Sequence, residues 1–243
     1  MKIVLYNIGY STGLKGSWRD YFLKCWRYLW SSAKTFKEIV EFFKRQNADI
    51  ICLLEADVGS FRNRFRSHVK LIADKLVLPF HHHALKYGPN SWSRFLPTIR
   101  KQHDAILSKI KGGITRHYLK SGTKKLVLEF RVAGISIFVV HLGLLRSNLR
   151  KRQMAEMTKI LKKCDQPYMV CGDFNIFKGL DEVKDFIKKN GLRIINEEAT
   201  FPSIKPKRQL DLIMACEAIS IKDSGVVQVS YSDHLPVYVE IET

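Results

Sequence analysis

The sequence predicts an α/β fold in which two β-sheets pack face to face and helices cover their outer faces. Two observations predict it: short apolar runs typical of strands outnumber the helical segments, and most helical segments follow a strand. An apolar content of 46% is ordinary for a protein with a sizeable core. The 243 residues contain no repeat, no low-complexity linker and no break in composition, so we predict a single domain over residues 1–243.

Short apolar runs bounded by polar residues or glycine predict the strands. They lie at 2–8, 48–56, 103–110, 125–132, 135–142, 167–173, 209–216 and 235–242. Ala133 and Gly134 separate two of these runs and predict a hairpin turn. The histidine run 81–83 has the composition of a zinc site, but side chains alternate sides along a strand. We therefore favour an exposed or half-buried strand there.

Helices are predicted at 33–46, 149–164 and 179–191. The first carries an apolar stripe at helical spacing, formed by Phe36, Ile39, Val40 and Phe43. The second is amphipathic and basic. Gly191 closes the third as a typical C-terminal cap.

The net charge of +18 and the isoelectric point near 9.8 predict a polyanionic partner, either nucleic acid or an anionic membrane lipid. The five cysteines are scattered and form no C-x-x-C pair, which argues against a disulfide framework and favours a reducing compartment. We find no signal peptide and no apolar run near the roughly 18 residues of a membrane span. We therefore expect a cytoplasmic protein, with peripheral membrane contact left open, and no feature predicts a protein partner.

Polar residues that could form a site interrupt or follow the apolar strands. They are Asn7, Glu55, His141, Asp173, Asn175, Asp211, Asp233 and His234. Each alone has an ordinary explanation as a turn residue, except Asp211, because a carboxylate inside a strand must be paired or bind a metal. Together they supply the oxygen ligands that a hard cation such as Mg²⁺ prefers, and histidines that can act on a phosphate near neutral pH.

Six short motifs carry a family resemblance. They are LYNI (5–8), LLEA (53–56), VVHL (139–142), GDFN (172–175), QLDLI (209–213) and SDHLPV (232–237). In this order they resemble the endonuclease/exonuclease/phosphatase superfamily of DNase I-like proteins, and the resemblance runs from residue 3 to residue 242. It implies a four-layer α/β sandwich with two mixed β-sheets and flanking helices, and a metal-dependent hydrolase that cleaves phosphate esters.

The resemblance also implies roles for the metal ligands. Glu55 would be the principal ligand of Mg²⁺, for which Mn²⁺ is an alternative. Asn7 would complete the metal site, and Asp233 would lie beside it. Some nucleases of the superfamily carry an acidic residue two positions after the asparagine, where this sequence has Gly9. Metal binding is therefore expected to depend more heavily on Glu55.

The catalytic roles follow from the same resemblance. Asp173 would orient or deprotonate the attacking water, and Asn175 would hold a phosphate oxygen as charge develops on it. His234 would contact the scissile phosphate, with Asp211 fixing its tautomer, and His141 would donate to the phosphate. The glycine of GDFN would allow a close backbone approach, with the phenylalanine turned into the core.

His103 and Asp104 depart from the small residues that the superfamily usually has before its ILS strand. The sequence leaves open whether they join the site or pair with each other.

Two further features bear on the substrate. Residues 18–30 carry an aromatic stripe at helical spacing that includes Trp18 and Trp26. This stripe would pack on the sandwich, lie in a membrane interface, or stack on the bases of a single strand. Basic residues cluster at 60–70 and 146–153, where Arg150 and Arg152 resemble a common pattern of the superfamily. They would bind phosphates or headgroups, or would simply be solvated.

Three functions remain open. A Mg²⁺-dependent nuclease is favoured, because backbone recognition needs only a basic surface. The alternative is a membrane-associated phospholipid or phosphoinositide phosphodiesterase or phosphatase that docks through residues 18–30. The third is a binding module without catalysis, which the complete set of catalytic residue types disfavours.

Overall fold

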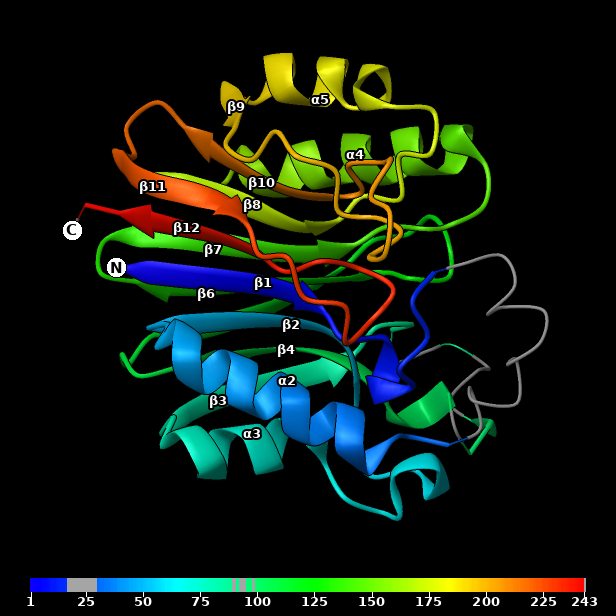
Figure 1. Cartoon of the computed structure of the whole chain (residues 1–243). Helices are drawn as coiled ribbons and strands as arrows, with labels where there is room; N and C mark the ends of the chain where they lie inside the picture. The colour runs from blue at the N-terminus through cyan, green and yellow to red at the C-terminus, as the bar shows by residue number, and fades with distance from the viewer. Residues whose placement is uncertain (17–29, 89–90, 92–94, 98, 243) are drawn as a thin grey trace.

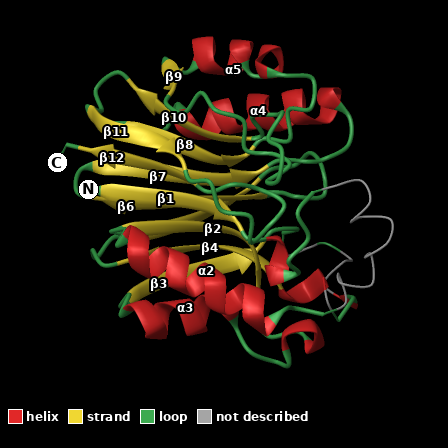
Figure 2. Cartoon of the chain, viewed as in Figure 1, coloured by secondary structure: helices red, strands yellow, loops and turns green. Residues whose placement is uncertain are grey.

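Two six-stranded β-sheets form the framework of the computed structural model, which describes residues 1–16, 30–88, 91, 95–97 and 99–242 (Figures 1 and 2). The first sheet has the order β11 (Ile221–Val226), β12 (Val237–Ile241), β1 (Lys2–Asn7), β2 (Ile50–Asp57), β4 (Gln102–Ser108) and β3 (Phe80–Leu85). The second has the order β5 (Gly113–Tyr118), β6 (Leu126–Val132), β7 (Ile135–His141), β8 (Tyr168–Asp173), β10 (Asp211–Cys216) and β9 (Leu192–Ile194).

The layers follow the predicted α/β sandwich. One apolar cluster joins the inner faces of the two sheets. A second packs α2 (Ala33–Gln46) and α3 (His68–Leu76) on the first sheet, and a third packs α4 (Ser147–Leu161) and α5 (Lys184–Lys189) on the second. The predicted four-layer arrangement with helices outside is therefore confirmed (Figure 2). Among the described residues, no helix is both long and apolar enough to cross a membrane.

Both sheets are mixed, and the parallel pairs decide where the strands end. β1 runs parallel to β2 in one sheet and β7 parallel to β8 in the other, whereas the remaining pairs are antiparallel. Helix α2 connects the first pair and α4 connects the second. Parallel neighbours end at the same edge of a sheet. The last residues of all four strands therefore lie on the same side of the sandwich (Figure 1).

Most predicted elements appear with boundaries that agree within a few residues. The helix at 33–46 is found with these bounds, capped by the Ser32 hydroxyl, which accepts from the Thr35 N–H (3.2 Å). The hairpin turn is also confirmed, because Ala133 and Gly134 both have positive φ between β6 and β7. The histidine run lies in β3 at the edge of its sheet, with His81 exposed and His82 and His83 half-buried.

The prediction of a single helix over 179–191 is wrong. It divides into the 3₁₀ turn η6 (Leu180–Glu182) and the six-residue α5. The reason is Glu182, a buried carboxylate that accepts from the backbone N–H of Lys178 (3.0 Å) and binds a guanidinium, so the first turn cannot wind as an exposed helix. Helix α3 and strands β5, β9 and β11 were not predicted.

Three further short 3₁₀ turns occur among the described residues. They are η1 (Gly9–Ser11), η3 (Phe61–Asn63) and η5 (Ile99–Lys101).

A buried histidine makes the fold sensitive to acid. His68 is 0% exposed, stacks on Phe36 with ring centroids 4.7 Å apart, and accepts the Asp57 N–H at Nδ1 (3.2 Å). Burial lowers the pKa of His68 from 6.5 to about 4. As the pH falls, His68 is therefore protonated in the unfolded chain at a higher pH than in the folded protein, which favours unfolding. We expect His68 to contribute stability above pH 6.5 and to lose on the order of 3 kcal/mol of it as the pH falls towards 4.

Urea unfolding at pH 7 and pH 4.5 measures this loss. His68→Asn keeps an acceptor for the Asp57 N–H but has no proton to bind, so it should lose less stability on acidification than the wild type. The control is His81→Asn at an exposed position of β3, which should lose as much as the wild type. Equal losses in all three proteins would contradict the assignment.

Candidate active site

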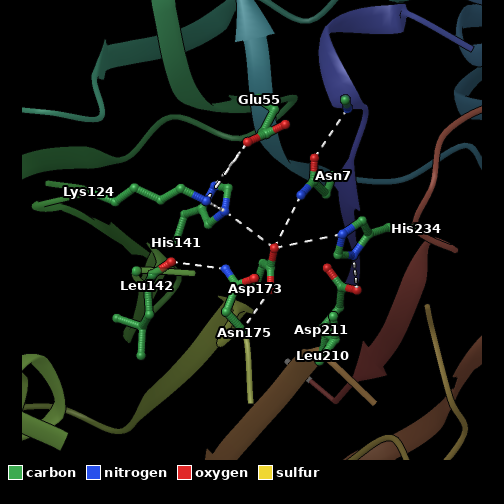
Figure 3. A network of polar contacts seen from close by, with 12 residues as sticks. Asn7, Glu55, Lys124, His141, Leu142, Asp173, Asn175, Leu210, Asp211 and His234 are labelled. Atoms are coloured by element: carbon green, nitrogen blue, oxygen red, sulfur yellow. Dashed lines mark hydrogen bonds and ion pairs between the residues drawn. The ribbon is translucent and has the colours of Figure 1, made fainter. Parts of the chain in front are cut away.

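The polar residues that follow the strands meet in one cleft between the ends of the two sheets (Figure 3). β1 ends at Asn7 and β2 carries Glu55 near its end, while β7 ends at His141 and β8 at Asp173. His141 is in register with Asp173 across the parallel pair, and Asp211 is in register with Asp173 across the antiparallel neighbour. Strand pairing alone therefore places three of these side chains together.

A β-bulge directs Glu55 into the cleft. The pairing of β2 with β4 shifts register between Leu53 and Ala56, and Glu55 has a φ of 55°. A bulge of this kind re-aims a side chain at the rim of a sheet. Asp104 on β4 holds the bulge, because its carboxylate accepts the Glu55 N–H at 3.1 Å.

The turn at Gly172–Asn175 aims two polar groups the same way. A Cβ at Gly172 would lie 1.9 Å from the Val140 carbonyl oxygen, so only glycine fits there. Asp173 then accepts the Asn175 N–H at Oδ1 (2.9 Å), while Phe174 is buried at 0% exposure. Asn175 has a φ of 51°, a conformation that asparagine tolerates. The predicted close approach and the inward phenylalanine are both confirmed.

Asp173 is the centre of the polar network. Its Oδ2 accepts from Asn7 Nδ2 (3.3 Å) and lies 3.3 Å from His141 Nε2 and 3.8 Å from His234 Nε2. Burial would raise the pKa of Asp173, but His234 and then His141 hold it well below its usual range. Asp173 is therefore a carboxylate at neutral pH and can accept a proton or orient a water.

His234 is fixed from behind by a buried carboxylate. Asp211 Oδ2 lies 2.6 Å from His234 Nδ1 and accepts the Thr200 hydroxyl at 2.6 Å. This contact leaves Nε2 facing Asp173 and the cleft. Burial lowers the pKa of His234, but Asp211 and Asp173 more than offset it and raise the value to about 10. The imidazolium is therefore a proton donor at neutral pH.

Two lysines that were not predicted flank Glu55. Lys86 Nζ donates to Glu55 Oε1 (3.0 Å) and to the Tyr10 hydroxyl, and this lysine is 2% exposed. Lys124 Nζ lies 3.9 Å from the same carboxylate oxygen and contacts His141 Nε2. Burial would raise the pKa of Glu55, but Lys86 and then Lys124 lower it well below its usual range. Glu55 is therefore ionised whether or not a metal is bound.

Helix α4 fixes the loop that carries Lys124. Gln153 Nε2 donates to the Lys124 carbonyl (2.6 Å), and its Oε1 accepts the Gly143 N–H (2.9 Å). Glu156 accepts from Ser121 at both N–H and hydroxyl. Lys124 therefore reaches the cleft from a loop held at several points.

The cleft has a volume of about 470 Å³. The polar residues that line it are Asn7, Glu55, Lys124, His141, Asp173, Asn175, Asp233 and His234. Seven of these eight were predicted from the sequence. The eighth predicted residue, Asp211, lies behind His234 rather than on the wall.

The donor set suits a hard divalent cation. Asn7, Glu55 and Asp233 line the cleft, and carboxylate and amide oxygens are what such a cation prefers. The Asn7 oxygen accepts the Gly9 N–H (3.2 Å). In the described part of the chain, one group of three side chains brings metal-binding atoms within 4.8 Å of one another, namely Asp173, Asp211 and His234. Asp211 and His234 already bind each other at 2.6 Å, so two of the three members of this group have a partner within the protein. His81–His83 form no such group with described residues.

Arg150 was predicted to bind substrate, and the structure contradicts this. Its side chain is 3% exposed and binds Glu182 (2.6 Å), with further hydrogen bonds to the carbonyls of Gly143 and Leu144. A buried guanidinium needs such partners, and these hydrogen bonds give Arg150 a structural role in holding the loop before α4 to Glu182. Arg152 is exposed on the same helix, as a substrate-binding residue requires.

Other expectations have mixed outcomes. His103 and Asp104 do not pair with each other, because His103 Nδ1 contacts His83 Nδ1 (2.9 Å) while Asp104 faces Glu55. Trp18 and Trp26 lie outside the described residues. Trp30, at the end of the aromatic stripe, is 56% exposed.

A sandwich of two mixed sheets, with a buried aspartate–histidine pair and the carboxylates of Glu55 and Asp173 at one end, is the arrangement of a metal-dependent phosphoric ester hydrolase. The sequence profile described as "Endonuclease/Exonuclease/phosphatase family" matches residues 27–234. The chain belongs to this family. A comparison with curated protein sequences gives no match.

Solved structures share the fold over the whole chain. An endonuclease/exonuclease/phosphatase family protein from Leptotrichia buccalis aligns with a TM-score of 0.71 and 14% identity, covering 100% of both chains. A mannosyl-6-phosphatase of Bacteroides thetaiotaomicron gives 0.67 and 15%, again covering 100% of both. The beta toxin of Staphylococcus aureus gives 0.67 and 19%, with the same coverage. At these identities the similarity shows the fold alone.

Proposed function

We propose that the protein is a Mg²⁺-dependent phosphodiesterase that hydrolyses nucleic acid. One observation carries the reaction class: Glu55, Asp173 and His234 face a single cleft. Mg²⁺ or Mn²⁺, held by Glu55 with Asn7 and Asp233, would supply Lewis-acid stabilisation of the phosphate.

The chain's own residues supply the proton chemistry and the binding of the phosphate. Asp173, an acceptor at neutral pH, orients the attacking water and takes its proton. His234, held by Asp211, donates to the phosphate through Nε2. Asn175 and His141 face the same cleft and hold phosphate oxygens, while Lys124 adds positive charge there.

Nucleic acid is the favoured substrate because of charge. The net charge of +18 suits a phosphodiester backbone, whose binding depends on neutralising successive phosphates. A hollow that shares Leu144 and Phe177 with the cleft is lined by Arg146, Arg152 and Lys178, so a long polyanion has a basic surface to follow.

A phospholipid or phosphoinositide is the second candidate. The observation that favours it is a pair of exposed leucines beside the cleft: Leu144 is 52% exposed and Leu145 is 74% exposed. Leu144 also lines the cleft wall. Exposed apolar side chains can insert at the boundary between lipid headgroups and acyl chains, and this pair would then hold the cleft at a membrane surface.

A parallel hydrolysis assay in Mg²⁺ separates the two candidates. The substrates are single-stranded and plasmid DNA, RNA, and liposomes that contain sphingomyelin or phosphoinositides, with His234→Ala as the inactive control. We expect strand cleavage that the control lacks. Headgroup release with intact nucleic acid would assign the lipid function instead. If neither nucleic acid nor lipid is hydrolysed, both candidate functions are wrong.

A further inference from the structure

A second hollow adjoins the catalytic cleft. Its volume is about 840 Å³, and it shares Leu144 and Phe177 with the cleft wall. The first turn of α4 forms one side of it, and residues 177–178 form the other. No aspartate or glutamate is among its described lining residues.

Four cations surround this hollow, which we call the basic groove. Arg146, Arg152 and Lys178 line it, and the guanidinium of Arg208 lies 5.0 Å from the centre of the Phe177 ring at its edge. All four side chains are exposed. Among the described residues none of these four forms an ion pair, in contrast to Arg150, which also lines the hollow but is neutralised by Glu182. The groove therefore holds positive charge that the fold does not compensate.

A row of rings leads from the catalytic histidine into the basic groove. The His234 ring lies 5.1 Å from the Phe201 ring, and Phe201 lies 6.1 Å from Phe177. Phe177 in turn meets Arg208. Both phenylalanines line the catalytic cleft and are half-buried, so each keeps part of its ring towards the open space.

We propose that the basic groove binds single-stranded nucleic acid on one side of the scissile phosphate. Backbone phosphates would bind Arg146, Arg152, Lys178 and Arg208, and bases would stack on Phe177 and Phe201. The proposal rests on the proposed function, and it names the substrate class as a single strand. In a duplex the bases are paired and stacked on each other, so they are not free to lie on these rings.

The shape of the site favours a strand over a membrane. Arg146, Arg152 and Lys178 line a hollow, and the flat surface of an anionic bilayer follows a concave surface less closely than a flexible chain does. Membrane-binding side chains must instead protrude. A flexible single strand follows a concave basic surface, with aromatic faces for its bases.

The test measures binding apart from hydrolysis. The groove variant is Arg152→Gln, Lys178→Gln and Arg208→Gln together, and Arg146 is kept because its φ is 64°. The control is Lys162→Gln, Lys163→Gln and Lys188→Gln, which removes the same charge from exposed positions elsewhere. Fluorescence anisotropy with a single-stranded oligonucleotide in EDTA, over a series of salt concentrations, gives the slope of log K against log salt.

Three lost phosphate contacts should reduce the magnitude of that slope by about 2 in the groove variant. The control variant should keep nearly the wild-type slope and unchanged hydrolysis of a small diester. Phe177→Leu, which keeps an apolar side chain but removes the ring, should weaken oligonucleotide binding by roughly tenfold at constant salt.

Equal slope changes in the groove variant and the control would overturn the proposal. The proposal would also be overturned if the groove variant lost binding to vesicles of phosphatidylcholine and phosphatidylserine but kept its binding to the oligonucleotide. That result would assign the groove to a membrane. Binding is measured without metal and is therefore independent of hydrolysis. If the protein hydrolyses no substrate, the proposed function is wrong, but the salt slopes still show whether the groove binds a single strand. If the protein cleaves nucleic acid but the groove variant keeps the wild-type slope, the proposed function stands and the proposed binding in the groove is wrong.

Discussion

Replacing His234 with alanine is expected to lower kcat by roughly 10³-fold on every phosphate ester the protein hydrolyses. His234 lines the cleft, and Asp211 and Asp173 keep it protonated at neutral pH. Its Nε2 lies 3.8 Å from Asp173 in the cleft, so under the proposed function the substitution removes a proton donor from the transition state. Steady-state rates on an oligonucleotide and on a small diester should fall by similar factors, because the loss belongs to the chemistry and not to strand binding.

The control for this prediction is His117→Ala. His117 binds Glu129 (2.7 Å) on the second sheet and does not line the cleft, so its removal should leave the rates nearly unchanged. Circular dichroism should show that both variants are folded. A fall of less than tenfold in His234→Ala would mean that this histidine does not act on the phosphate.

Much of the candidate site could be predicted because it lies at the ends of strands. Asp173 and Asp211 interrupt apolar runs, and a polar residue inside a buried strand needs a partner. Once the strands pair, the register brings them opposite each other. The same reasoning identifies His141 beside Asp173. Strand periodicity, strand ends and polar interruptions were sufficient for this part of the site.

The two lysines could not be predicted in this way. Lys86 follows β3, an edge strand, and Lys124 belongs to a loop. Nothing in the local sequence distinguishes them from the other basic residues of a strongly basic chain. Only tertiary structure shows that both ammonium groups approach Glu55. The bulge that turns Glu55 towards them is equally invisible, because it depends on Asp104 from another strand.

Arg150 shows a pattern that was present in the sequence but was interpreted wrongly. It lies on the same helical stripe as Met154, Met157 and Leu161, all of which are buried. The spacing of four, three and four residues places it on the inner face of α4. Arg152, two positions further on, lies off this stripe and is exposed. Edge strands β5 and β11 were missed for a different reason. Neither contains a buried residue, and both lack the apolar alternation of a strand with one face in the core.

Replacing Lys86 is expected to have the second large effect, on stability. Under the proposed function, Lys86 and the metal compete for the carboxylate of Glu55. Burial lowers the pKa of Lys86, but Glu55 raises it well above its usual range, so the residue remains an ammonium. It holds Glu55 Oε1 at 3.0 Å. Lys86→Met should therefore leave a largely buried carboxylate without its nearest cation. Because removing one partner of a buried pair is costly, we expect the free energy of unfolding without metal to fall by about 3 kcal/mol.

Mg²⁺ should reverse part of that loss. With Lys86 gone, the metal loses its nearest competitor at Glu55 and only the more distant Lys124 remains (3.9 Å), so the rise in Tm on adding Mg²⁺ should be larger in Lys86→Met than in the wild type. Glu55→Gln should show almost no rise, because the principal metal ligand has lost its charge. In the double variant the stability without metal should recover towards that of Glu55→Gln alone, since no uncompensated charge remains. Scanning calorimetry of the four proteins in EDTA and in Mg²⁺ measures all of these quantities without reference to activity. A full Mg²⁺ response in Glu55→Gln would place the metal elsewhere in the cleft, and the next residue to test would then be Asp233, which lines the same wall.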